Sequence, residues 1–258
     1  MGTRLIIHTD SRKQADVNTF RAAAMTLKKS YQTKYALSND TIKVQFVKSG
    51  KDIVREINSI GKGNLVSLDI VSHGNQGGIH ISRDMSKPEK SGLIKRNAHV
   101  LIRRYSDRPQ TEEDAEYMEE SMHGLYSDYA SKVGVSYYYN QKLSDSTDIA
   151  TLDDIDFSVF SKTTFVEFHG CRTAEVVPIL NTYLKNNFAE NFSSNLDKDA
   201  TVIGHITNAA PDKNPNGNVN DYRYGKVRMY QGGKMIKDGV SRSTLMIYNS
   251  STPGNASK

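Results

Sequence analysis

Short apolar runs alternate with amphipathic stretches over the first 72 residues of the chain. Residues 3–9 (TRLIIHT), 41–49 (TIKVQFVKS) and 65–72 (LVSLDIVS) are rich in apolar and β-branched side chains, which is typical of buried strands. Between them, residues 17–31 and 51–60 carry apolar side chains at spacings of three and four, which predicts two helices. This βαβαβ order favours a parallel sheet with helices on both faces.

The same rhythm returns after a long interruption. Residues 162–171 (KTTFVEFHGC) and 199–207 (DATVIGHIT) predict a fourth and a fifth core strand, with a helix expected from about Pro178 between them. Residues 83–152 carry a basic stretch followed by an acidic one, which we interpret as a charged insertion over the core. Residues 208–248 alternate and turn at glycines, which predicts β-hairpins. We therefore expect a single α/β domain over residues 1–258, with a mostly parallel central sheet.

Composition narrows the classes of function. The chain has 258 residues, 37% hydrophobic residues and a formal net charge of +5, which is weaker than the charge of a dedicated nucleic-acid binder. A mean hydropathy of −0.58 indicates a folded core with long polar excursions. The first residues resemble neither a signal peptide nor a membrane-spanning helix. We expect a cytoplasmic protein, or one secreted without a classical signal peptide, with no membrane role.

Two predicted strands end in reactive side chains. The third ends at Ser72, His73 and Gly74, and the fourth ends at Gly170 and Cys171, the only cysteine. Ligands bind at the carboxyl ends of parallel strands, so the imidazole and the thiol face each other if these strands are neighbours. A thiolate is a nucleophile, and an imidazole can accept its proton and return one to a leaving amine. The backbone amides of Gly74 and Cys171 are candidate oxyanion-hole donors.

These motifs carry a resemblance to a known family. The stretches DIVSHGNQGG (69–78) and FVEFHGC (165–171), within a βαβαβ layout, resemble the clan CD cysteine peptidases and are most similar to their bacterial members, including toxin self-processing domains. The resemblance implies a caspase-hemoglobinase-like three-layer sandwich, a β-flap in the terminal hairpins, Cys171 as nucleophile and His73 as general acid/base. The cysteine lacks the preceding Gln-Ala of caspases, so the resemblance does not imply specificity for aspartate.

Other polar residues near the strand ends are candidates for a substrate pocket. Asp69 and Glu167 lie just inside the two strands and would favour a basic substrate residue if they reach the pocket, while His169 and His205 would line it. His169 is an alternative catalytic base. A zinc site built from His73, His169 and Cys171 matches no closed structural spacing, so we expect no metal in the chemistry.

Two activating ligands are candidates, although the chemistry requires no cofactor. Residues 212–217 (DKNPNG) match the first half of a calcium loop, but Arg223 stands where a glutamate belongs, which favours a simple turn. The toxin-type relatives bind inositol hexakisphosphate on a basic face near the β-flap. This chain has a comparable late cluster of basic residues: Lys213, Arg223, Lys226, Arg228, Lys234 and Lys237. A solvated hairpin explains the same residues.

The sequence thus favours a cysteine endopeptidase that acts on a protein or peptide, in the context of a bacterial effector or toxin. The alternative is a catalytically inactive caspase-like interaction module that binds a protein or nucleic acid. The reactivity of Cys171 distinguishes the two, because an activated thiolate alkylates at lower pH than a packed thiol.

Overall fold

The structure is a computed structural model and describes residues 2–11, 14–75, 78–81, 98–102, 150–176, 186–209 and 225–241. The helices are α1 (Gln14–Lys34), α2 (Gly50–Asn58) and α4 (Phe188–Ser194), with two 3-10 helices, η4 (Leu152–Asp154) and η5 (Phe157–Val159). The strands are β1 (Thr3–Thr9), β2 (Thr41–Val47), β3 (Leu65–Val71), β4 (His73–Asn75), β5 (Gly78–Ile81), β6 (Ala98–Ile102), β7 (Ala150–Thr151), β8 (Phe160–Phe168), β9 (Thr201–His205), β10 (Lys226–Gln231) and β11 (Lys234–Ser241).

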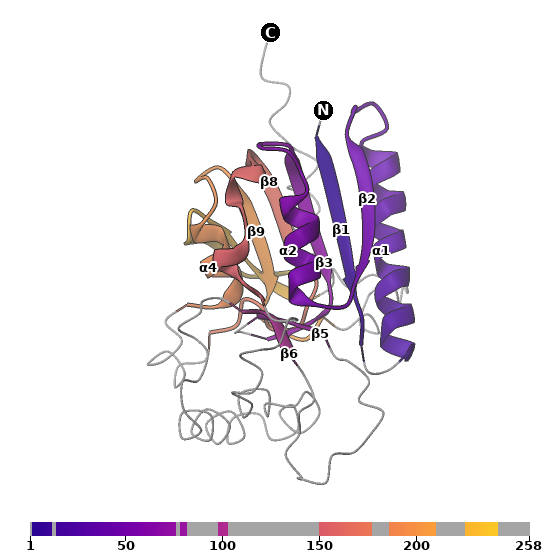
Figure 1. Cartoon of the computed structure of the whole chain (residues 1–258). Coiled ribbons are helices and arrows are strands. Elements are labelled where there is room, and N and C mark those ends of the chain that lie inside the picture. The colour runs from indigo at the N-terminus through magenta and orange to yellow at the C-terminus, as the bar shows by residue number, and fades with distance from the viewer. Residues whose placement is uncertain are drawn as a thin grey trace.

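Seven strands form one sheet in the order β11-β10-β9-β8-β3-β1-β2 (Figure 1). Five neighbouring strands of this sheet, β9, β8, β3, β1 and β2, pair in parallel. The pairs β9–β10 and β10–β11 are antiparallel. The prediction of an α/β fold with a mostly parallel sheet and C-terminal hairpin strands is confirmed. Gly232 and Gly233 form the turn of that hairpin with φ of 52° and 75°, a conformation that favours glycine.

Helices cover both faces of the sheet, because successive strand residues point to opposite sides. On β1, Ile6 packs with Phe20 and Leu27 of α1. Its neighbours Leu5 and Ile7 belong to the larger apolar cluster on the other face. That cluster includes residues of α2 and α4, so those two helices lie on the face opposite α1.

Several local expectations need adjustment. The second helix begins earlier than expected, at Gly50, and the side chain of Ser49 caps it by accepting a bond from the Asp52 amide. The first helix is described from Gln14, and residues 12–13, which precede it, lie outside the described residues. The helix expected from Pro178 falls on residues 177–185, outside the described part of the chain.

Of the region expected as an insertion, residues 83–152, only residues 98–102 and 150–152 are described. β4, β5, β6 and β7 form a second, four-stranded sheet, and β4 follows β3 directly. Residues 82–97 and 103–149 lie outside the described residues, as does most of the predicted charged insertion. None of the described helices is both long and apolar enough to cross a membrane.

Candidate functional site

The strands that carry His73 and Cys171 are neighbours. β3 and β8 pair in parallel, with Ile70 opposite Phe168 near their carboxyl ends. Beyond the pairing, the backbones of Gly74 and Gly170 nearly touch: a Cβ atom added to Gly170 would lie 3.2 Å from both Cα and N of Gly74. Two glycines are needed at this approach because neither position has room for a side chain. The adjacency on which the sequence prediction depended is therefore present.

Cys171 lies in a sharp turn after β8. Residues 171–174 form this turn, and Arg172 has a φ of 56°, which is uncommon for a residue other than glycine. The turn is fastened to the end of β9, since the Arg172 amide donates to Thr207 O at 3.2 Å and the Ala174 amide donates to His205 O at 2.8 Å. The structure has a turn at these positions, so no helix begins at the Cys171 thiol.

The surroundings of Cys171 disfavour the thiolate form. The residue as a whole is partly exposed, but burial of the sulfur raises the pKa of the thiol. The backbone amide of Ala209 and the charge of Arg172 act in the opposite direction without offsetting the burial. The structure therefore holds a thiol rather than a preformed thiolate.

The imidazole of His73 is held from the side of α1. Its Nε2 lies 3.2 Å from Oδ2 of Asp16 and 3.3 Å from Oγ of Ser11, and the Ser11 hydroxyl donates to the same carboxylate oxygen at 3.0 Å. The edge of the Phe20 ring packs against it at 5.0 Å between centroids. In the described part of the chain, no hydrogen bond joins His73 to Cys171. Sequence reasoning missed Asp16, because nothing in the pattern shows which turn of α1 lies beside the strand end.

The four residues expected to line a substrate pocket lie together in one buried cluster. Asp69, Glu167, His169 and His205 are each at most 1% exposed. Nε2 of His169 lies 2.8 Å from Oδ1 of Asp69, and the hydroxyl of Tyr31 donates to the other oxygen of Asp69 at 2.6 Å. The substrate-pocket role of the four residues stays a prediction. Sequence reasoning placed these residues at the strand ends but missed Tyr31.

The candidate ligand sites for calcium and inositol hexakisphosphate are only partly described. Residues 212–217, Lys213 and Arg223 lie outside the described residues. Arg228 on β10 pairs with Asp238 at 2.6 Å and donates to Ala174 O at 3.0 Å, so its guanidinium already has protein partners. Both ligands stay predictions.

Comparison with known proteins adds no relative to this picture. A scan against protein-family models, a search of curated proteins and a search of solved structures each find no match.

Proposed function

We propose that the protein is a cysteine endopeptidase with a caspase-like arrangement, in which Cys171 is the nucleophile and His73 transfers protons. The observation that carries this proposal is the close approach of Gly74 and Gly170 at the carboxyl edge of the parallel sheet. It brings the residues after β3 and β8 together where parallel sheets bind ligands. The seven-stranded order and the helices on both faces support the caspase-hemoglobinase-like interpretation of the whole domain.

The contacts of His73 suggest how the proton moves. If Nε2–H donates to Asp16, the lone pair of the ring lies on Nδ1, which becomes the basic nitrogen. Asp16 then acts as a positioning residue that holds the imidazole in this orientation. Because the resting thiol is protonated, His73 accepts its proton as substrate arrives rather than from a standing ion pair.

The reaction proceeds through an acyl-enzyme. The Cys171 sulfur forms a bond to the peptide carbonyl carbon, and the amides of Gly74 and Cys171 stabilise the oxygen as negative charge develops. The C–N bond breaks as His73 returns its proton to the leaving amine. Water then attacks the thioester carbon with its proton passing to His73. The C–S bond breaks, His73 returns the proton to the sulfur, and the carboxylic acid leaves with the free thiol regenerated.

A catalytically inactive interaction module is the second candidate. The raised pKa of the buried Cys171 thiol favours it, because a packed cysteine is commonly inert. In that case the fold would present a surface to a protein or nucleic-acid partner, and the strand-end residues would serve packing alone.

A survey of new peptide termini by mass spectrometry separates the two candidates. A denatured proteome is incubated with the purified protein and, as the matched control, with its Cys171→Ala variant. Each is tested alone, with calcium and with inositol hexakisphosphate. Termini that require Cys171 establish proteolysis and report the preferred cleavage site. No Cys171-dependent terminus under any condition, together with a thiol that resists alkylation until unfolding, would eliminate the peptidase and leave the interaction module.

A further inference from the structure

The polar cluster between β3, β8 and β9 contains more negative charge than a protein interior ordinarily accepts. Asp69 and Glu167 are cross-strand partners in the register of β3 and β8, so their side chains lie next to each other on one face. Both are buried, and two carboxylates side by side in a low-dielectric interior require compensating positive charge. A cation bound among them would supply it.

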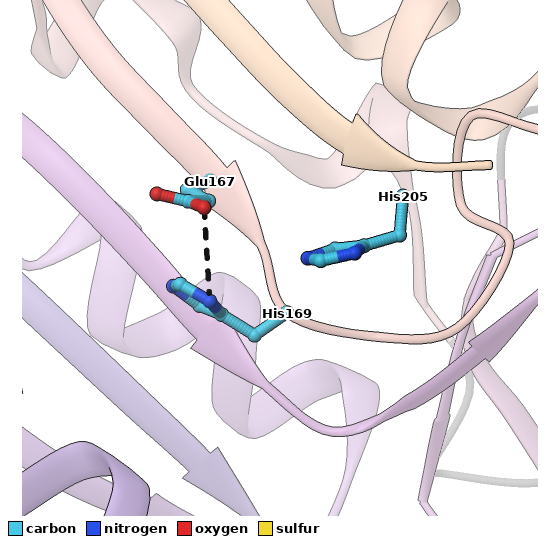
Figure 2. A group of neighbouring side chains, drawn as sticks. All are labelled: Glu167, His169 and His205. Carbon is cyan, nitrogen blue, oxygen red and sulfur yellow. Dashed lines mark ion pairs between the residues drawn. The ribbon is translucent and has the colours of Figure 1, made fainter. Parts of the chain in front are cut away.

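Three side chains of this cluster point toward one common space. Glu167 and His169 are two residues apart at the end of β8, and His205 ends β9 one residue beyond the pair Phe168–Gly204. The strand pairing therefore brings His205 level with His169, and Figure 2 shows its ring directed toward the other two side chains. One ligand atom from each of the three lies within 4.8 Å of the others.

His169 is oriented as a metal ligand. Its Nε2 is bound by the Asp69 carboxylate, which is itself held by the Tyr31 hydroxyl. Nδ1 is fully buried, has no hydrogen-bond partner in the described part of the chain and lies 3.9 Å from Oε1 of Glu167. With the Nε2–H donated to Asp69, the lone pair of Nδ1 faces the Glu167 carboxylate. A carboxylate that fixes the distal nitrogen of a histidine is the usual outer contact of a metal-bound imidazole.

We propose that Glu167, His169 and His205 bind one divalent transition-metal ion, with Asp69 orienting His169 from behind. Two imidazoles and a carboxylate are a ligand set that zinc and neighbouring first-row metals prefer. Ligand atoms around tetrahedral zinc lie about 3.4 Å apart. Side-chain rotations that move the three ligand atoms closer by roughly 1 Å would bring them to that spacing. Two negative carboxylates and one divalent cation also balance in charge. The site is buried, and an ion in it would join the ends of β8 and β9.

This inference does not depend on the proposed peptidase activity, and its test does not measure that activity. The full chain without an affinity tag is purified and its metal content is measured, with about one equivalent per chain expected. A chelator-treated sample is then titrated with Zn²⁺ while its unfolding temperature is followed, and we expect an increase of several degrees. Co²⁺ in place of zinc should give visible bands of nitrogen and oxygen ligation without the near-ultraviolet band of a thiolate ligand.

Variants assign the ligands. Glu167→Gln and His205→Asn should each weaken Zn²⁺ binding by at least about a hundredfold, and Asp69→Asn by about tenfold to a hundredfold. His8→Asn is the matched control, since His8 is also a buried strand histidine but lies on β1, and it should bind zinc like the wild type. Cys171→Ala should also retain the metal. The Co²⁺ spectrum of the wild type tests the site even where a ligand variant fails to fold.

The proposal is overturned by any of three results. The wild type holds no stoichiometric metal and shows no zinc-dependent change in unfolding temperature. Zinc binds equally well to Glu167→Gln and His205→Asn. Or the Co²⁺ spectrum contains a thiolate band, which would move the ion to Cys171. The first result would mean that no bound metal ion balances the two carboxylates.

Discussion

The contact between the two glycines at the sheet edge makes Gly170→Ala an informative substitution. The added Cβ would lie 3.2 Å from Cα and N of Gly74 and 3.3 Å from C of His73. All three are backbone atoms, and ordinary contact begins near 3.4 Å, so the two segments must separate by a few tenths of an ångström. Overpacking of this kind costs about 1–2 kcal/mol of folding free energy. A full ångström of misplacement costs about 100-fold in rate, so we expect about threefold to tenfold here.

The matched control is Gly63→Ala, at the other end of β3. Gly63 has a φ of 68° and no atom within 4 Å of an added Cβ, so alanine there introduces backbone strain of about 1–2 kcal/mol without a steric clash. Both variants should unfold at lower temperature by similar amounts. Only Gly170→Ala should lower kcat/KM for a peptide found in the terminus survey. Wild-type activity and stability in Gly170→Ala, or an equal loss of activity in Gly63→Ala, would refute the reasoning.

Three further outcomes are expected. Asp16→Asn removes the carboxylate that holds His73 and should lower kcat about tenfold or more while changing the unfolding free energy by less than about 1 kcal/mol, because Asp16 is partly exposed. Iodoacetamide should modify Cys171 in the free protein with a midpoint above that of an ordinary exposed cysteine, since burial raises the pKa of the thiol and the reactive thiolate forms only as pH rises through it; a midpoint below that of an ordinary exposed cysteine would contradict this. Tyr31→Phe leaves one oxygen of buried Asp69 without its donor and should lower the unfolding free energy by about 1–3 kcal/mol in urea denaturation.

The sequence pattern predicted the parallel strands well because their burial on both faces produces long apolar runs. Leu65–Val71 is such a run, and the structure pairs it with Phe160–Phe168, whose buried part is its last few residues. Boundaries were less accurate where a single hydrogen bond decides them. The α2 helix begins at Gly50 because the Ser49 hydroxyl accepts from the Asp52 amide, a local signal that the apolar periodicity does not contain.

The positions of the candidate catalytic residues at strand ends could be predicted from the sequence. The side chains that surround them could not. His73 contacts Asp16 and Ser11, which are about 60 residues earlier in the chain, and the sequence gives no indication of the rotation of α1 that brings Asp16 to the strand end. The turn at Cys171 was likewise unpredictable. Backbone bonds to Thr207 and His205 hold it, and these partners come from the next strand of the sheet.

The buried polar cluster shows why position along a strand does not determine chemistry by itself. Alternation correctly places Glu167 and His169 on one face of β8, but it does not tell whether solvent reaches that face. An exposed carboxylate there would attract a basic substrate residue. A buried one, with Asp69 beside it, must instead find a cation or a proton within the protein. Burial therefore favours an ion over a substrate side chain as the partner of these carboxylates. In the proposed site that ion would lie between Nδ1 of His169 and Oε1 of Glu167, which are 3.9 Å apart, with His205 as the third ligand.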